Sequence, residues 1–322
     1  MSPSIGSSPL LERHTLNTVL RRAILAGATN RMVRSFVNRY GMRLGGARFV
    51  AGETLDEAVP ILRGLNEQGF ETNTTLLGEH VEDEATTERV VETYKTILQR
   101  IAAERLRTNV ALKLTQLGLD YGEDLAFRNV ERLVVAAEAV GNFVRIDMEE
   151  SKWVDATLRV YRRLREAGHD NVGTVLQAYL FRTEQDLDSL LDLQPNLRLV
   201  KGAYLEPESV AYPAKADVDR AYAQLVKKML PPACSYLAVA THDESLIEHT
   251  RELVERAGIG RDRFQFQMLY GVRPQLQLDL ARQDFSVLVA TPYGPEWYPY
   301  LMRRLAERPA NLLFVARNLL KR

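Results

Sequence analysis

Several features are scarce in this sequence, and each absence excludes a class of protein. The chain has one cysteine, Cys234, so it can form neither an intramolecular disulfide nor a thiolate metal cluster. The five histidines show no ligand spacing such as H-E-x-x-H, and we therefore expect no metal site. No apolar run approaches the roughly 20 residues that a membrane-spanning helix requires, and no signal peptide is visible.

Net charge is also absent, because 42 Lys and Arg residues balance 42 Asp and Glu residues. A neutral chain has no overall field to attract nucleic acid, so we expect no nucleic-acid partner and only local charge effects. The low cysteine content suits a reducing, cytoplasmic compartment. At 322 residues the chain fits one barrel-sized domain of about 250 residues plus an extension.

The first fifty residues are unusually basic, with eight arginines against one acid, Glu12. Apolar residues between Met32 and Tyr40 recur at helical spacing, which predicts an N-terminal helical extension over residues 1–50. A basic amphipathic helix can rest on the surface of an anionic membrane, or it can pack on its own domain. The sequence leaves both possibilities open, and it leaves the oligomeric state open as well.

From residue 51 onward, short β-rich runs alternate with longer segments whose apolar residues recur every three or four positions. This alternation predicts a parallel sheet closed into a (βα)8 barrel, of the TIM type, over residues 51–322. An open doubly wound sheet is disfavoured because no G-x-G-x-x-G sequence opens a helix. The predicted strands are 71–77, 109–115, 143–148, 174–179, 197–202, 237–241, 264–269 and 286–291. The predicted helices include 85–105, 125–139, 154–167, 218–230, 245–257 and 274–282.

Polar residues gather at the carboxyl ends of the predicted strands, where barrel enzymes carry their chemistry. Lys113 lies amid apolar strand residues, and Asp147 at the end of the next strand is its expected partner, since a buried lysine needs one. Taken singly, each strand-end polar residue is ordinary for a barrel rim. Because seven strands carry them, we predict a polar barrel mouth that accepts an anion.

Residues 300–307 form a second candidate site near the end of the chain. On a helix, Tyr300, Arg303, Arg304 and Glu307 share one face, because they are spaced at i, i+3, i+4 and i+7. Two neighbouring guanidiniums require either open water or an anion between them, and they can hold a carboxylate with paired hydrogen bonds. Alone, this face also fits a solvated surface stripe. The strand-end residues favour the anion clamp.

These residues, in this order, resemble the proline dehydrogenase family, and most closely its single-activity bacterial members. The resemblance covers residues 50–318. It is carried by seven motifs, at residues 112–114, 146–150, 175–180, 198–204, 240–243, 264–271 and 300–307.

The resemblance implies a (βα)8 barrel that binds FAD without a Rossmann domain and carries its last helix over the strand ends. It also implies oxidation of L-proline to Δ1-pyrroline-5-carboxylate, with electrons passed to a quinone. Asp147 and Arg198 match catalytic positions, with Asp147 paired to the active-site lysine and Arg198 beside the flavin. The implied substrate-binding residues are Lys113, Leu199, Tyr204, Tyr300, Arg303 and Arg304. The implied FAD-binding residues are Met148, Gln177, Arg198, Lys201, Gly202, Ala203, Thr241, His242, Gln267 and Leu269. By the resemblance, the last helix, which contains residues 300–307, is a lid over the substrate, and Glu307 matches the acid of this lid.

One position departs from the family pattern. Ala290 stands where the family usually has a tyrosine, two residues before the proline of an x-P-x-G turn formed here by Thr291–Gly294. The smaller residue predicts a wider pocket and weaker discrimination against 4-hydroxyproline, unless Tyr293 fills the space. Two further hypotheses remain, namely a barrel enzyme for another carboxylated or phosphorylated metabolite and a binding protein without catalysis.

Overall fold

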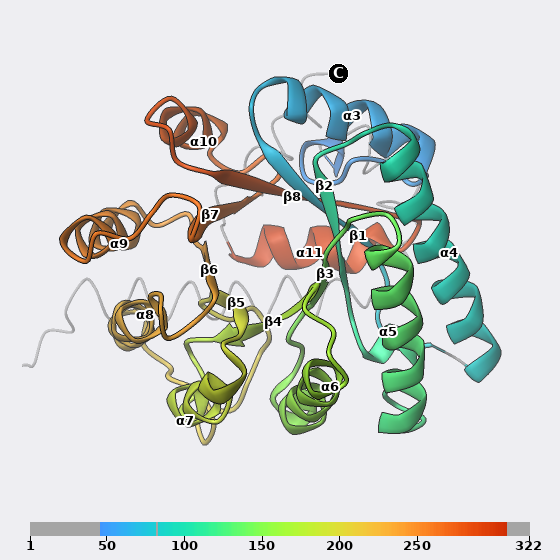
Figure 1. The fold of residues 1–322 in the computed structure, drawn as a ribbon, viewed down its shortest axis with the longest axis horizontal. Helices are drawn as coiled ribbons and strands as arrows, with labels where there is room; N and C mark the ends of the chain where they lie inside the picture. The colour runs from blue at the N-terminus through green and yellow to red at the C-terminus, as the bar shows by residue number, and fades with distance from the viewer. Residues whose placement is uncertain (1–45, 82, 308–322) are drawn as a thin grey trace, which may run out of the picture.

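Eight parallel strands close into a barrel in the order in which they occur along the chain (Figure 1). The computed structural model describes residues 46–81 and 83–307, except for the side chains of residues 305–307. Strand β8 closes the ring by pairing with β1, where Ala290 lies opposite Asn73. The strands are β1 (Glu71–Leu76), β2 (Thr108–Leu112), β3 (Val144–Ile146), β4 (Val172–Gln177), β5 (Asn196–Val200), β6 (Tyr236–Ala240), β7 (Phe264–Leu269) and β8 (Val287–Tyr293).

Helices alternate with the strands and form the outer layer of the barrel (Figure 1). The predicted barrel and the six predicted helices are confirmed, with small differences at the ends of elements. The sequence reasoning missed α3 and the short α7. The helices are α3 (Leu55–Glu67), α4 (Glu84–Ala103), α5 (Glu123–Glu138), α6 (Val154–Glu166), α7 (Thr183–Asp188), α8 (Lys215–Met229), α9 (Glu244–Arg256), α10 (Pro274–Ala281) and α11 (Trp297–Glu307).

Most strand ends differ from the prediction by one to three residues, and the ends of β2 and β8 have a clear local description. Strand β2 ends at Leu112 rather than at residue 115, because the chain turns into the 3-10 helix η2 (Thr115–Leu117). The turn is held by Glu149, whose carboxylate accepts hydrogen bonds from the Thr115 backbone (3.0 Å) and hydroxyl (2.5 Å). Strand β8 continues through Tyr293, so the predicted x-P-x-G turn is wrong, since most of its residues belong to the strand.

Side chains along each strand alternate between the barrel interior and the apolar layer beneath the helices. That apolar layer contains the largest buried side chains, among them Tyr94 on α4 and Tyr222 on α8. Each tyrosine donates its hydroxyl hydrogen bond to a strand carbonyl, Tyr94 to Ala111 (2.9 Å) and Tyr222 to Leu199 (3.0 Å). A buried phenol needs such a partner, so these bonds also fix the height of each helix against its strand.

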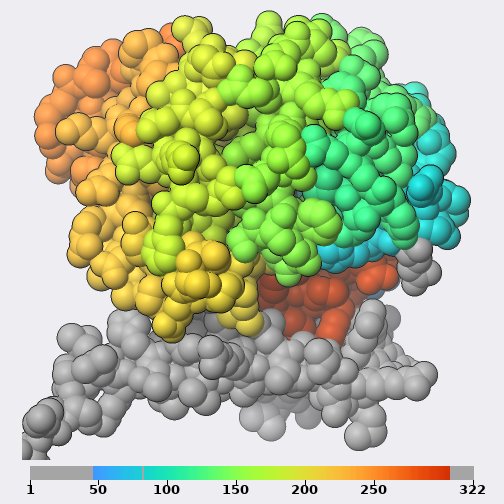
Figure 2. Space-filling view, turned by 90° about the horizontal axis from the view of Figure 1, so that it is seen from below, coloured from blue at the N-terminus to red at the C-terminus, as the bar shows by residue number. Residues whose placement is uncertain are grey.

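Helix α11 crosses one end of the barrel rather than joining the outer ring of helices. In Figure 1 it lies across the ring of strands, and in Figure 2 its red surface appears at one end of the coloured body. Its apolar face packs on Phe49, Val50 and Leu77 in a cluster separate from the main core. Trp297, at the start of the helix, donates a hydrogen bond to Glu53 (2.9 Å). This arrangement turns the opposite face of α11 toward the barrel end.

The predicted extension over residues 1–50 lies largely outside the described residues. The described part, residues 46–50, begins with the 3-10 helix η1 (Gly46–Arg48) and packs against the barrel, with Phe49 and Val50 buried. Within the described residues, no helix combines the length and apolar character needed to cross a bilayer.

Candidate active site

Two residues that follow strands and one residue inside a strand meet at the barrel mouth. Lys113 follows β2, Asp147 follows β3, and Arg198 lies inside β5. The Lys113 Nζ is 3.8 Å from Asp147 Oδ2, and Arg198 Nη1 donates to Asp147 Oδ1 at 3.0 Å. The predicted pairing of Lys113 with Asp147 is therefore confirmed. One carboxylate thus sits between two largely buried cations and offsets part of their charge.

A carboxylate that the sequence reasoning did not select, Glu79, completes this cluster. It accepts from Arg303 Nη2 at 2.9 Å, lies 3.8 Å from Lys113 Nζ, and is 3.4 Å from the Tyr204 hydroxyl. Glu79 lies three residues beyond the end of β1, where the rule that selected Lys113 and Asp147 also applies. Its carboxylate thus lies within ion-pair distance of both Arg303 and Lys113.

The mouth keeps Lys113 charged. Burial alone would lower the pKa of Lys113, but the nearby Tyr204, Asp147 and Glu79 together raise it above its usual value. Burial raises the pKa of Tyr204 to about 12, so its phenol stays protonated and can donate a hydrogen bond. The pocket therefore offers one ammonium, one guanidinium and one phenol to an anion.

The two arginines of α11, the predicted lid, contribute unequally to this pocket. Arg303 points into the mouth, as its contacts with Glu79 show, and its guanidinium carbon lies 6.0 Å from the centroid of the Tyr204 ring. The guanidinium carbon of Arg304 lies 5.3 Å from the centroid of the Tyr300 ring. The side chain of Glu307 lies outside the described residues. The structure thus brings Arg303 together with Lys113 and Tyr204, while Arg304 stacks on Tyr300.

Arg198 is held from two sides inside the barrel. Besides the bond to Asp147, its Nε donates to Gln267 Oε1 at 2.6 Å. Burial lowers the pKa of Arg198, and the Asp147 charge partly opposes this effect. An arginine pKa starts far above neutrality, so the group remains a cation. Its remaining nitrogen, Nη2, has no hydrogen-bond partner within the part of the chain that the structure describes.

A second charged cluster joins the ends of β5 and β6 to the first turns of α8. Lys201 Nζ donates to Asp219 (2.5 Å) and to Asp243 (2.8 Å), and Lys215 contacts the same two carboxylates. Burial alone would raise the pKa of Asp243, but hydrogen bonds from Lys201 and Lys215 lower it to about 2. Gly202 follows with φ +120°, and an added Cβ would lie 2.2 Å from the Tyr179 ring, so only glycine fits there.

The other predicted FAD-binding residues lie on the same side of the barrel. His242 Nε2 accepts from the Leu269 backbone at 2.9 Å, which joins the ends of β6 and β7 and places the proton of a neutral ring on Nδ1. Gln177 donates to the Glu149 backbone at 2.9 Å. Thr241 is buried beside His242, and Met148 is buried in the main core. Ala203 follows Gly202 in the loop after β5.

Two predictions about pocket-shaping residues are wrong. Leu199 does not line the mouth, because it alternates with the inward-facing Arg198 and is fully buried in the layer beneath the helices. Tyr293 does not fill the space beside Ala290, because it faces the same outer layer and is buried there. Leu269, opposite Ala290 in the β7–β8 register, is the apolar residue on the interior side.

Glu149 is a buried acid with a structural place in the mouth. Its side chain is 2% exposed, and burial raises its pKa above the usual value, with Lys113 and the Thr115 hydrogen bonds opposing that rise. The carboxylate fixes the turn after β2, which carries Lys113. Glu149 belongs to the motif at residues 146–150, but sequence reasoning assigned it no role.

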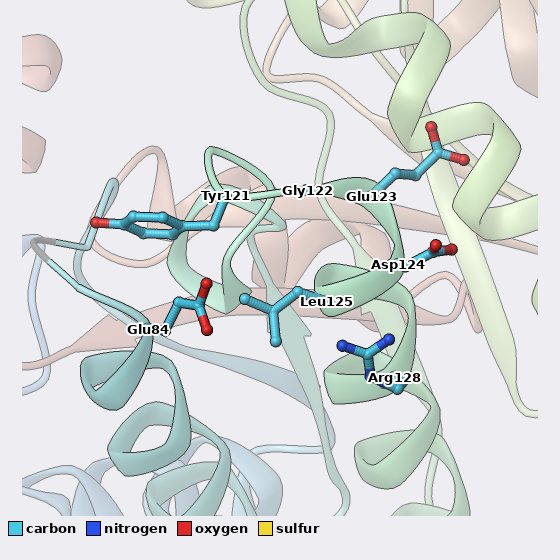
Figure 3. Close-up of a pocket in the computed structure, with 7 residues that line it drawn as sticks. All are labelled: Glu84, Tyr121, Gly122, Glu123, Asp124, Leu125 and Arg128. Atoms are coloured by element: carbon cyan, nitrogen blue, oxygen red, sulfur yellow. The ribbon is translucent and has the colours of Figure 1, made fainter.

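A shallow pocket on the rim contains none of the predicted site residues. It lies between the first turns of α4 and α5 and is lined by Glu84, Tyr121, Gly122, Glu123, Asp124, Leu125 and Arg128. Figure 3 shows Glu84 and Arg128 on opposite sides of Leu125. The mixed charges and open shape suit a solvated depression, and the chemistry remains at the barrel mouth.

Many barrel enzymes could have such a mouth, and comparison with known proteins shows to which family this chain belongs. A model of the family "Proline dehydrogenase" matches residues 58–317. The chain belongs to the proline dehydrogenase family. Proline dehydrogenase 1 of Bacillus subtilis (strain 168) is 41% identical over 304 residues, which cover 94% of this chain and 100% of that protein. The proline dehydrogenase of Deinococcus radiodurans is 41% identical over 310 residues, covering 95% of this chain and 99% of that protein.

Solved structures of proline utilization A proteins share the fold. The crystal structure of proline utilization A from Bdellovibrio bacteriovorus superimposes with a TM-score of 0.78 at 21% identity, covering 91% of this chain. This chain spans only 37% of that longer protein. At this identity the likeness extends to the barrel and not to the chemistry.

Proposed function

We propose that this protein is an FAD-dependent proline dehydrogenase, which oxidises L-proline to Δ1-pyrroline-5-carboxylate. The observation that carries the proposal is the Glu79 carboxylate held by Arg303, beside Lys113 and Tyr204. A substrate carboxylate would be recognised by the same groups. The relatives of nearly equal length at 41% identity support the same activity.

Carboxylate binding orients the substrate. A fork such as Arg303 and a point charge such as Lys113 hold a carboxylate at two places, which restricts rotation of the attached ring. Hydride transfer requires reacting atoms about 3 to 3.5 Å apart, so a rigid hold on the carboxylate contributes directly to the rate. Arg304 and Tyr300, stacked on the same lid, would enclose the ring and exclude water.

The residues at the ends of β5, β6 and β7 fit FAD in their chemistry. A buried cation (Arg198), a further ammonium (Lys201), a histidine with its proton on Nδ1 (His242) and an amide (Gln267) suit a cofactor that carries a pyrophosphate and gains negative charge on reduction. We propose that they hold it together with Met148, Gln177, Gly202, Ala203, Thr241 and Leu269. FAD, when bound, supplies the two-electron acceptor for the hydride.

The chain's own groups also prepare the substrate nitrogen. The amine must be neutral before the neighbouring carbon can release a hydride. The cations Lys113, Arg303 and Arg198 disfavour a further positive charge in the same pocket, so proline is expected to lose its proton on binding. The affinity for L-proline should therefore rise with pH through the ionisation of the bound amine, and an affinity that does not change with pH would contradict this step.

The decisive experiment is anaerobic addition of L-proline to the FAD-loaded protein while the flavin absorption is followed. Bleaching by L-proline, and not by pyrrolidine, which lacks the carboxylate, is expected. Proline binding without bleaching would indicate a binding protein, and a protein that cannot be loaded with FAD would indicate a different barrel enzyme.

Three further points extend the proposal. We propose a quinone as the electron acceptor, a cytoplasmic location, and contact of the basic N-terminal residues 1–50 with the inner face of the membrane. Sedimentation with anionic vesicles, compared with neutral ones, tests the contact. A second candidate substrate is 4-hydroxyproline or a related cyclic imino acid, which is favoured by the small Ala290 beside Leu269.

A further inference from the structure

A line of hydrogen bonds runs through the barrel interior from the floor to the mouth. Gln265 Nε2 donates to Glu71 Oε2 and to Ser286 Oγ, both at 2.8 Å. Gln267 Nε2 donates to Gln265 Oε1 at 3.0 Å, and Arg198 Nε donates to Gln267 Oε1 at 2.6 Å. The line thus connects exposed Glu71 at the start of β1 with the buried guanidinium beneath the mouth.

The direction of this line is fixed at both ends. A carboxylate such as Glu71 can only accept, and a guanidinium such as Arg198 can only donate. If the Gln265 amide were turned over, its oxygen would face the Glu71 carboxylate and its nitrogen would face the nitrogen of Gln267. The same reversal of Gln267 would set its nitrogen against Arg198 Nε. Each amide therefore has one favourable orientation, and the orientation of Gln267 depends on Gln265.

This dependence matters because Gln265 and Gln267 are deeply buried, at 2% and 5% exposure, so water does not readily replace a lost partner. Arg198 has its Nε and Nη1 occupied by Gln267 and Asp147, which leaves its Nη2 edge for the mouth. A guanidinium held at two points presents its third nitrogen in one direction. A guanidinium held only by Asp147 can pivot about that bond.

We propose that Gln265 is a positioning residue for the redox step, acting through Gln267 to fix the guanidinium of Arg198. The inference rests on the proposed function, in which Arg198 stabilises the negative charge that FAD gains. Gln265 is remote from the carboxylate-binding groups Lys113 and Arg303, so it sets the electron-accepting half of the site and not the affinity for the substrate.

Two substitutions distinguish the hydrogen-bond acceptor of Gln265 from the space that its side chain fills. Gln265→Leu removes the acceptor for Gln267 and frees that amide to turn over. Gln265→Glu keeps an oxygen facing Gln267 whether or not it is protonated, and the neighbouring Glu71 charge favours the neutral form. Ser286→Ala is the matched control, because it removes one partner of Gln265 but leaves the bond to Glu71.

The expected result is that flavin reduction changes while the affinity for a carboxylate ligand does not. In Gln265→Leu, the equilibrium constant for flavin reduction and the limiting rate of reduction by L-proline fall about tenfold. For a two-electron couple this corresponds to a midpoint potential about 30 mV more negative. Gln265→Glu and Ser286→Ala stay within about threefold of the parent protein. The dissociation constant of cyclopentanecarboxylate, which has the carboxylate but no ring nitrogen, stays within twofold in all three variants.

The inference is overturned if Gln265→Leu and Gln265→Glu give the same potential and rate, or if ligand affinity falls in step with the rate. A crystal structure of flavin-free Gln265→Leu adds a test that needs no activity, since Arg198 Nε should leave Gln267. If that variant does not fold, the crystal structure of Gln265→Glu is the test. Arg198 should stay bonded to Gln267 there, and a displaced Arg198 would overturn the inference. A parent protein that L-proline does not bleach would instead refute the proposed function.

Discussion

The Glu79 carboxylate at the mouth gives a sharp prediction, because it occupies the groups proposed to bind the substrate. Its Oε1 lies 2.9 Å from Arg303 Nη2 and 3.8 Å from Lys113 Nζ. A carboxylate ligand must displace it. The substitution Glu79→Gln keeps the shape and removes the charge, so it should strengthen the binding of a competing carboxylate.

The magnitude follows from the partial burial of this ion pair. The side chains of Arg303 and Glu79 are 23% and 22% exposed, so their attraction is neither fully screened nor fully desolvated. Hydrogen bonds to charged groups contribute about 1.5 to 3 kcal/mol, and the retained amide oxygen keeps part of that. A net change of about 1.4 kcal/mol is expected, which makes the dissociation constant of cyclopentanecarboxylate about tenfold smaller.

Calorimetric titration of the two proteins measures this change. Glu53→Gln is the matched control, because Glu53 also lies against α11, where it accepts from Trp297, and the substitution removes the same charge. Cyclopentylmethanol, which lacks the carboxylate, should bind both variants equally. If Glu79→Gln binds cyclopentanecarboxylate no more tightly than Glu53→Gln does, Glu79 does not compete for the substrate site.

Three other substitutions test separate parts of the site. Arg303→Met should raise the KM for L-proline at least tenfold with a smaller fall in kcat, because the hold on the carboxylate acts in both ground and transition states; steady-state kinetics with an unchanged KM would exclude this role. Ala290→Tyr should increase the preference for L-proline over 4-hydroxyproline about tenfold. An unchanged ratio of kcat/KM values would refute the argument that the small Ala290 widens the pocket. The pKa of Asp243 is lowered to about 2 by Lys201 and Lys215, so its stabilisation is present above the usual pKa near 4 and is lost as pH falls through 2. Urea unfolding should therefore show Asp243→Asn less stable by about 1 kcal/mol at pH 6, with the difference narrowing below pH 4, and a constant difference would contradict the assignment.

Periodicity predicted the barrel because strand and helix repeats differ strongly, and the strand-end rule then found Lys113 and Asp147, whereas Arg198, inside β5, was found only through the family resemblance. The same rule would have found Glu79, but the predicted end of the first strand carried no polar residue to draw attention to it. Leu199 and Tyr293 were misplaced for another reason, since the face of a strand residue depends on register, and one residue reverses it. The dependence of Gln267 on Gln265 is likewise invisible in sequence, because it joins residues on one strand through an interior that only the closed barrel creates.

The surface on which α11 packs is formed largely by the residues just before α3, including Phe49 and Val50. Gly271 approaches so closely that an added Cβ would lie 1.7 Å from the Arg48 carbonyl oxygen, and Arg48 Nε donates back to the Gly271 carbonyl at 3.1 Å. Phe49 and Val50 then continue beneath Trp297 and Leu301. A fragment cut at residue 50 would therefore lose the platform on which its last helix rests.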